Sequence, residues 1–299
     1  MPRVSLGLPV YNGERYLRFA LDSILAQTFT DFELIICDNA STDTTVEICN
    51  AYSAKDPRIA VHRNPENLGA AKNYNKVFEL SRGEYFKWAS HDDTIAPTYL
   101  ERCVGALDTN LSFSLCYPTT VVIDANGRAL DTDPNDNITA NGNTPNERLK
   151  DFLVSNARNR KCNAVFGLIR TSFLKRTPLI GAFASSDKVL LAELALYGEF
   201  AHLPDPLFFR RDHPESSVNA NPGLKERTAW FDPKKKNSPS RQHWTWLSEY
   251  LNAVRRVPMN PAQKILCRMQ LLRWVRWERK RLMQELTSSV TRPFATGTP

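Results

Sequence analysis

The stretch RVSLGLPVYNGERYLRFALDSILAQTFTDFELIICD, residues 3–38, decides the fold class of this chain. It begins and ends with short apolar and β-branched runs, 3–10 and 32–38, which are typical of buried strands. Between them, apolar residues recur at helical spacing: Tyr16, Leu17, Ala20, Leu21, Ile24 and Leu25. A strand, a helix and a second strand in this order predict a βαβ unit with parallel strands.

The same alternation continues along the chain. Strand-like runs occupy 58–63, 84–90 and 112–124, and helical patterns occupy 46–52 and 70–81. Farther on we expect strands around 163–170 and from 199 onward, and helices at 97–107, 147–155, 187–197, 242–256 and 261–287. Residues 125–146, rich in Asn, Asp, Gly and Pro, predict a loop or lid that opens with a hairpin at Ala125-Asn126-Gly127. This order predicts an α/β protein with a mainly parallel sheet flanked by helices, and a C-terminal helical extension.

Length and composition narrow the class of protein. With 299 residues, 42% of them hydrophobic, the chain can bury one large core, with or without an appended unit. The first residues lack the apolar segment of a secretory signal, and no apolar run is long enough to span a membrane. The six cysteines show no CxxC pairing, so we expect free thiols in a reducing cytosol rather than disulfides or zinc ligands.

Polar residues follow each of the first four predicted strands: LPVYNGE, CDNASTD, NPENLGAAKN and SHDD. Open α/β sheets bind ligands beyond the carboxyl ends of their strands, so these segments predict one site. Asp38 is placed to accept hydrogen bonds from a ribose or a base, whereas Ser41, Thr42 and Asp43 are typical of helix caps.

Neither GxGxxG nor GxxxxGK[ST] occurs, so a nucleotide here would need cations to hold its phosphates. The adjacent carboxylates Asp92 and Asp93 suit Mg²⁺ or Mn²⁺. The alternative is that this acid pair caps the helix at 97–107.

These segments together resemble the inverting glycosyltransferases of family 2, which have the GT-A fold. PVYNGERYLRFALDSILAQTFTDFELIICDNASTDTT resembles the opening of that family, and NPENLGAAKNYNKVFELSRGEYFKWASHDD continues it. The resemblance is strong over residues 3–108, moderate to about 215 and absent beyond. It implies a GT-A (Rossmann-like) catalytic domain at 1–232, with a nucleotide-sugar-binding half (1–108) and an acceptor half (109–232). A linker and a basic amphipathic helical tail would occupy 233–299.

The resemblance implies a nucleoside-diphosphate-sugar donor, a UDP-sugar above others. The residues that match the family's contacts with the nucleoside are Pro9, Tyr11, Glu14 and Asp38, with Tyr11 stacking on the base. Asn67 and Lys72 match a polar contact and a basic residue near the diphosphate. The alternatives are a core aromatic for Tyr11 and a solvated helix face for Lys72.

The family's metal motif is Asp-x-Asp, and this sequence departs from it. The matching window is Ser90-His91-Asp92 followed by Asp93, so serine replaces the first acid. A literal Asp-x-Asp at 131–133 lies in the Gly/Asn/Pro-rich loop rather than at a strand end, and we reject it. The resemblance implies that Asp92 and Asp93 share the ribose and the Mg²⁺ or Mn²⁺, without deciding which does which. We expect His91 to be a spacer or a residue that supports a metal ligand without binding the metal itself.

Transfer with inversion needs a general base that takes the proton of the acceptor hydroxyl. The resemblance implies Asp187, in FASSDKVLLAELALYGEF, although Ser186 stands where the family has Glu. RRDHPESS resembles the family's Arg-x-His-x-x-Ser segment, so His213 would reach the metal or the diphosphate and Arg210 or Arg211 the leaving group. The alternatives are a helix-terminal acid for Asp187 and a satisfied loop histidine for His213.

The tail is strongly basic. Residues 233–299 carry 14 Lys or Arg and three Glu, a net charge of +11 against +7 for the whole chain, so the first 232 residues carry −4. In QKILCRMQLLRWVRWERKRLMQEL, seven apolar residues predict one helical stripe: Ile265, Leu266, Met269, Leu272, Val275, Leu282 and Leu286. The stripe would dock on the catalytic domain or on a second subunit, or would lie on an anionic membrane surface. No nucleic-acid-binding motif accompanies it, so we expect no nucleic-acid partner.

The sequence therefore predicts an inverting glycosyltransferase that moves a sugar to a hydroxyl of a glycan or lipid-linked acceptor, as in cell-envelope polysaccharide biosynthesis. We expect it in the cytoplasm, with peripheral attachment to the inner face of the membrane as a variant of that expectation. One alternative is a nucleotidyltransferase, but that class carries a glycine-rich basic loop where YNGERYL stands here. Another is a nucleotide-sugar-binding protein without turnover, which the serines at 90 and 186 motivate.

Overall fold

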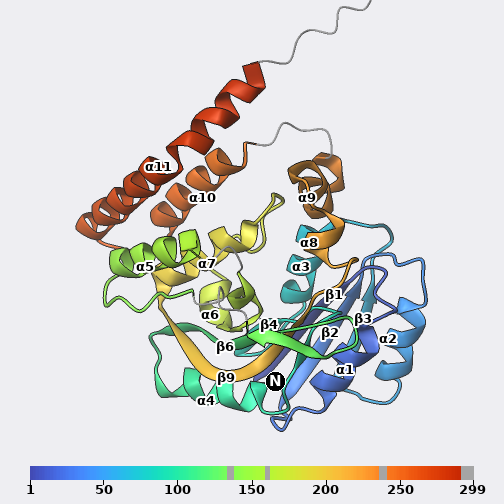
Figure 1. The fold of residues 1–299 in the computed structure, drawn as a ribbon. Coiled ribbons are helices and arrows are strands. Elements are labelled where there is room, and N and C mark those ends of the chain that lie inside the picture. The colour runs from blue at the N-terminus through green and yellow to red at the C-terminus, as the bar shows by residue number, and fades with distance from the viewer. Residues whose placement is uncertain (133–137, 159–161, 236–240, 291–299) are drawn as a thin grey trace, which may run out of the picture.

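A nine-stranded sheet organises the chain, with strand order β3-β2-β1-β4-β8-β6-β9-β5 and β7 paired to β6 (Figure 1). In this computed structural model the described residues are 1–132, 138–158, 162–235 and 241–290. Part of the predicted linker at 234–241 and Asp133 of the rejected Asp-x-Asp lie outside them.

The N-terminal half confirms the predicted βαβ units. Its strands are β1 (Val4–Val10), β2 (Phe32–Asp38), β3 (Ile59–Arg63) and β4 (Tyr85–Trp88), all parallel to one another. The helices between them are α1 (Leu17–Leu25), α2 (Thr45–Ser53) and α3 (Ala70–Glu79). Gly7 in β1 lets α3 approach, because a Cβ there would lie 2.6 Å from Val77 and 2.8 Å from Phe86. The first three strands end in register, with Val10 beside Asp38 and Asp38 beside Arg63.

The second half of the sheet mixes both directions. The short strand β8 (Leu168–Arg170) lies antiparallel between β4 and the long strand β6 (Phe113–Ile123). β9 (Glu199–Arg211) runs parallel to β6, and β5 (Thr94–Ile95) pairs antiparallel with β9. The predicted hairpin is confirmed: β7 (Ala129–Thr132) returns along β6 after a turn in which Gly127 has φ +86°.

One strand prediction is partly wrong. Residues 163–166 form the 3₁₀ helix η1 (Asn163–Phe166), and only three residues of the expected strand belong to the sheet. β5 and the helices between the end of β9 and residue 235 were not predicted from the sequence. The remaining helical elements are α4 (Tyr99–Thr109), α5 (Pro145–Arg158), α6 (Thr171–Leu174), α7 (Ser186–Tyr197), α8 (Ser217–Ala220), α9 (Leu224–Phe231), η2 (Pro233–Lys235), α10 (Gln242–Arg256) and α11 (Pro261–Val290).

Two hydrophobic cores cover the two faces of the sheet. Alternate residues of β2 point to opposite sides: Leu34 and Ile36 pack with α1, α2 and α4, whereas Ile35 and Cys37 pack with α3, α5 and α7. The core that contains Ile35 and Cys37 continues into α10 and α11, which lie beyond α7 and α5 in Figure 1. An ion pair between Arg256 of α10 and Glu193 of α7, 2.8 Å long, joins these helices as well. The C-terminal helices therefore share a core with α5 and α7.

All six cysteines are buried free thiols, as predicted. Among the described residues, no helix has both the length and the apolar character needed to cross a bilayer.

Candidate active site

The acid pair lies where β4 ends, in a buried turn that β9 closes from the other side. The carboxylate Oδ2 of Asp92 is 3.0 Å from Nε2 of His213, and its Oδ1 accepts a short hydrogen bond from the Ser90 hydroxyl. Asp93 turns toward the strand instead and accepts the backbone N–H of Arg211 at 2.9 Å. The two adjacent acids therefore have different partners, a distinction that the sequence left open.

The surroundings split the proton affinities of the two carboxyls. Burial alone would raise the pKa of Asp92, but the charge of His91 and hydrogen bonds from His213 and Ser90 hold it below its ordinary value. Burial and the negative charge of Asp92 raise the pKa of Asp93 well above the ordinary value. Asp92 is therefore the more acidic carboxyl of the pair.

The two arginines at the end of β9 differ in what they bind. Arg211 is buried, and its guanidinium donates to the backbone carbonyls of Asp92, Asp124 and Ala125 at 2.9–3.2 Å. The Nε of Arg210 is buried without a hydrogen-bond partner among the described residues. The arginine free to bind a ligand is thus Arg210, while Arg211 ties the acid turn to the β6–β7 hairpin.

The loops after β1 and β2 hold each other. Asn12, at φ +50°, donates its backbone N–H to the Ser41 hydroxyl at 2.9 Å. The next residue must be glycine, because a Cβ on Gly13 would lie 2.7 Å from the ring of His91. The Glu14 carboxylate accepts from the backbone N–H and the hydroxyl of Thr44 at 2.9 and 2.7 Å. Glu14 therefore caps α2, and the loop connects directly to the acid turn through His91.

The predicted nucleoside contacts lie at this edge of the sheet. Pro9 is buried within β1 beside Cys37 of β2. Tyr11, the first residue after β1, is 44% exposed. The carboxylate of Asp38 is fully buried, accepts the backbone N–H of Ser41 at 3.2 Å and lies 3.3 Å from Nε of Arg63. An exposed aromatic ring and a buried carboxylate at adjoining strand ends can contact a base and a ribose.

A network of amides supports the loop before α3. Asn67 accepts from the Asn39 side chain at 2.8 Å and from the backbone N–H of Gly69 at 2.9 Å. Asn39 in turn accepts from Asn64, which receives the ammonium of Lys76 at 2.6 Å. Lys72 lies exposed in the first turn of α3. The amide of Asn67 is thus engaged in positioning the loop, and Lys72 is open to solvent.

Asp187 stands in the first turn of α7, two residues after Ser185, the N-cap residue, which has φ +58°. Its Oδ1 is buried without a hydrogen-bond partner among the described residues, and burial raises its pKa. Tyr74 of α3 links it to the acid pair: the pKa of Tyr74 is raised by burial and then by the charges of Asp92, Asp93 and Asp187. Asp187 and the acid turn therefore both lie near enough to the Tyr74 hydroxyl for their charges to raise its pKa.

Several predicted site residues have buried polar atoms without a partner in the described part of the chain. Buried side-chain atoms usually find partners, so each exception calls for an explanation. Within the described part of the chain, the buried atoms without a partner include Tyr16 Oη, His213 Nδ1, Arg210 Nε, Asp187 Oδ1 and Ser186 Oγ. The ring of Tyr16 lies 4.5 Å from that of His213. Such atoms fit a site that a polar ligand completes.

Tyr16 and Tyr74 were not among the predicted site residues. Tyr16 falls on the apolar stripe of the first helix and Tyr74 on that of the third, so helical spacing assigned both to the core. Arg63, the cation nearest Asp38, carries no signal apart from its place at a strand end. These residues become visible as site residues only once the fold brings their neighbours together.

A divalent cation fits Asp92 and His213. Among the described residues no three His, Cys, Asp or Glu side chains converge, so the protein itself supplies an incomplete set of ligands. Adjacent ligands of an octahedral ion at about 2.1 Å are about 3 Å apart, and Asp92 and His213 are separated by 3.0 Å. Ions bound to nucleotides commonly take one or two protein ligands and complete their shell with phosphate oxygens and water. The Asp93 carboxylate instead accepts the backbone N–H of Arg211.

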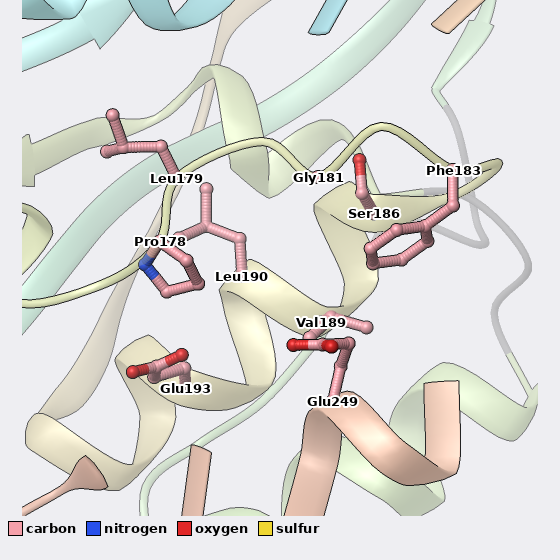
Figure 2. A pocket seen from close by; sticks show the side chains of 9 residues that line it. All are labelled: Pro178, Leu179, Gly181, Phe183, Ser186, Val189, Leu190, Glu193 and Glu249. Carbon is pink, nitrogen blue, oxygen red and sulfur yellow. The ribbon is translucent and has the colours of Figure 1, made fainter. Parts of the chain in front are cut away.

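A pocket of about 200 Å³ lies against α7 on the side of the 178–186 segment and α10 (Figure 2). Its wall is largely apolar, with Glu193 and Glu249 at one end, and Figure 2 shows Ser186 and Phe183 at the other. Two non-glycine residues with positive φ, Leu179 at +62° and Ser185 at +58°, bound the segment, and such strain persists only where the surroundings enforce it. The pocket therefore adjoins the turn that carries Asp187.

Solved structures share this architecture. A crystal structure of S. aureus TarS 1-349 in complex with UDP has a TM-score of 0.59 at 18% identity, and the match covers 95% of this chain and 88% of that one. The mannosyltransferase PcManGT from Pyrobaculum calidifontis, in complex with GDP-Man and Mn²⁺, has a TM-score of 0.54 at 15% identity and covers 99% and 88%. The predicted GT-A fold is confirmed.

Sequence comparison points to the same family. Chondroitin synthase of Escherichia coli is 34% identical over 131 residues, which are 44% of this chain and 19% of that protein. An uncharacterized glycosyltransferase of Rickettsia bellii is 35% identical over 130 residues, or 43% and 19%. The chain thus spans about a fifth of the length of these relatives. The model of glycosyl transferase family 2 matches residues 5–176, more than half of the sequence, and the chain belongs to that family.

Proposed function

We propose that this chain transfers a sugar from a nucleoside-diphosphate sugar to a hydroxyl of a glycan or lipid-linked acceptor, with inversion at the anomeric carbon. The observation that carries the proposal is the buried Asp92–His213 contact, at 3.0 Å, beside strand ends that hold Asp38 and Tyr11 in a chain of this family. The complexes of TarS with UDP and with UDP-GlcNAc, and of PcManGT with GDP-Man and Mn²⁺, support a nucleotide-sugar donor. A UDP-sugar is the donor that we favour.

The donor would lie along the ends of β1, β2 and β4. Tyr11 would stack on the base and Asp38 would accept a hydrogen bond from the nucleoside, with Pro9 and Glu14 shaping the pocket through the loops that they anchor. Lys72 and Asn67 would lie toward the diphosphate. Asp92 and His213 would hold Mg²⁺ or Mn²⁺, with Asp93 behind them; the ion supplies charge neutralisation of the diphosphate.

Asp187 would act as the general base. Its carboxylate would take the proton of the acceptor hydroxyl as that oxygen forms a bond to the anomeric carbon, and the bond from that carbon to the phosphate oxygen would break. The electron pair of the broken bond leaves with the nucleoside diphosphate, whose charge the free guanidinium of Arg210 would stabilise. Arg211 would keep the acid turn in place. Attack opposite the leaving group inverts the anomeric carbon.

The acceptor would approach along α7. The pocket in Figure 2 offers an apolar wall with Phe183, together with the Ser186 hydroxyl and the Glu249 carboxylate. An apolar surface suits the C–H face of a sugar ring, and the polar groups suit its hydroxyls. These features support a saccharide portion in the acceptor. Such chemistry belongs to polysaccharide assembly in the cytoplasm, at the inner face of the membrane where the acceptor is lipid-linked.

The test is transfer and hydrolysis with a panel of nucleotide-sugars in Mn²⁺, comparing the wild type with Asp187→Asn. We expect the wild type to release the nucleoside diphosphate from one donor, and the variant to bind that donor with little turnover. A wild type that binds nucleotide but neither hydrolyses nor transfers any sugar would show a binding protein instead. Release of pyrophosphate from a nucleoside triphosphate and a sugar phosphate would show a nucleotidyltransferase.

A further inference from the structure

The long helix α11 has two faces that the sequence did not separate. One face packs inward: Cys267, Leu271, Trp274 and Leu282 are buried against a core shared with α5 and α10. In Figure 1, α11 lies along the upper left rim, with α10 and α5 on its inner side. Its outer side has no neighbour among the described residues in that view. The predicted stripe is therefore divided between the two faces: Leu282 packs inward, whereas Ile265, Met269 and Leu272 are exposed.

Both acids of α11 face inward. Glu285 lies 2.6 Å from Nδ1 of His243 in α10, and Glu278 lies 3.9 Å from Nε2 of the same ring. Glu278 also pairs with Arg281 at 2.9 Å. These are the only carboxylates in residues 261–290, so the outer face of α11 carries none.

The outer face combines exposed apolar side chains with cations. Ile265 and Leu272 are 56% and 68% exposed, and Met283 is 60% exposed. At spacings of three and four residues these apolar positions share one line along the helix with basic ones: Ile265, Met269, Leu272, Arg276, Arg279, Lys280 and Met283. Arg268 and Arg273 flank it, and none of these five cations pairs with a carboxylate of the described residues. We call this set the outer face of α11.

We propose that the outer face of α11 lies on an anionic lipid bilayer. Its positive charge complements the phosphates of anionic headgroups, and its exposed Leu, Ile and Met side chains can enter the headgroup–acyl boundary. Trp277, exposed at the edge of this face, is a side chain that favours that boundary. The segregation of both acids onto the inner face leaves no carboxylate to oppose this attraction. The inference stands apart from sugar transfer, since binding to vesicles needs no donor.

The test is co-flotation of the full chain with vesicles of phosphatidylcholine alone or mixed with phosphatidylglycerol. We expect binding to the anionic vesicles that falls as salt is raised, and little binding to the neutral ones. Leu272→Glu should weaken it, whereas Leu111→Glu should not, although Leu111 is 77% exposed on a loop elsewhere. The paired change Arg276→Glu/Arg279→Glu should lower the partition coefficient at least about tenfold. The control Lys55→Glu/Lys175→Glu alters net charge equally at two other exposed sites and should leave most of the binding.

Circular dichroism and thermal unfolding check that each variant remains folded. No binding to anionic vesicles, or equal losses in the α11 variants and their controls, would overturn the proposal. So would a concentration-dependent dimer, seen by sedimentation, that Leu272→Glu dissociates, because the outer face would then contact a second copy. A protein that transfers sugar normally but does not bind anionic vesicles would overturn the membrane proposal and leave the proposed sugar transfer intact.

Discussion

Nε2 of His213 lies 3.0 Å from Oδ2 of Asp92, although 121 residues separate them in the chain. β9 makes this possible: it runs beside β6, pairs with the two-residue strand β5 just after the acid turn, and then places Arg211 and His213 against that turn. The contact joins residues 1–108 to residues 109–232, the two halves that the sequence predicted. A metal and a diphosphate held there would therefore depend on the packing of both halves.

The first prediction concerns the Asp92–His213 pair. Asp92→Asn or His213→Ala should weaken Mn²⁺-dependent binding of UDP or of the donor roughly 10- to 100-fold or more, because each would remove a proposed metal ligand. Calorimetry with and without Mn²⁺ measures the effect, and His62→Ala, a half-buried histidine on β3, serves as the control. If the Mn²⁺ dependence survives both changes, the ion binds elsewhere.

Asp93 gives a second prediction. Because it accepts the backbone N–H of Arg211 and its pKa is raised, Asp93→Asn should preserve most of the Mn²⁺-dependent affinity that Asp92→Asn loses. The comparison is made on the same calorimeter under the same conditions. Equal losses in the two variants would assign the metal to both carboxylates.

The strands that the sequence predicted best are those buried on both faces. β1 and β2 appear as continuous apolar runs because helices cover both sides of a parallel sheet. β5 and β8 have two and three residues, too few for any period to show, and η1 occupies an apolar run that a strand would fit equally well. α9 was not predicted because Leu224–Phe231 lacks a regular apolar face and packs at the surface.

The site could be predicted in part. Strand ends locate Asp38 and the acid pair because parallel strands end at one edge. The roles of Arg210 and Arg211 could not be told apart, since adjacent residues on a strand point to opposite sides and the carbonyls that hold Arg211 lie on other segments. Likewise, the inner and outer faces of α11 depend on which side α5 and α10 cover, and helical spacing alone does not say that.

The third prediction concerns the pH dependence of turnover. A general base must be ionised, and burial raises the pKa of Asp187, so kcat/KM should fall on the acid side at a pH above the ordinary carboxyl value of about 3.9. The charge of Lys188 lowers that pKa, so Lys188→Met should move the acid limb to higher pH and leave the plateau largely unchanged. Asp187→Asn should reduce the plateau roughly 10²- to 10⁴-fold. If Lys188→Met does not shift the pH at which kcat/KM falls, a group other than Asp187 acts as the base.

Lys87 supports a prediction about stability. Its ammonium is buried on β4, donates to the carbonyls of Phe166 and Trp88, and has its pKa lowered by burial from 10.5 to about 7. Between those pH values the unfolded chain binds a proton that the folded chain does not, so this group makes the free energy of unfolding rise with pH. Lys87→Met removes the effect and leaves two carbonyls unsatisfied, which costs about 1–3 kcal/mol each at every pH.

Denaturant unfolding at a series of pH values measures this effect. The free energy of unfolding of Lys87→Met, minus that of the wild type, should be highest near pH 7. It should fall by a few kcal/mol at most as the pH approaches 10, because the wild type gains stability over this range. Lys55→Met, at an exposed lysine, should show a constant difference over the same range. A difference for Lys87→Met that stays constant between pH 7 and 10 would mean that the ammonium remains charged in the fold.

The final prediction separates the two arginines that end β9. Arg211→Ala leaves the carbonyls of Asp92, Asp124 and Ala125 without their donor, so it should lower the free energy of unfolding by about 2–4 kcal/mol. Arg210→Ala should leave stability within about 0.5 kcal/mol but reduce kcat roughly 10²-fold, since a free guanidinium can stabilise the departing diphosphate. Arg210→Lys should recover part of that loss, because it keeps the charge without the planar fork. Denaturant unfolding and steady-state kinetics on the same preparations measure both effects. An Arg211→Ala protein that is as stable as the wild type but inactive would assign the leaving-group role to Arg211 instead of Arg210.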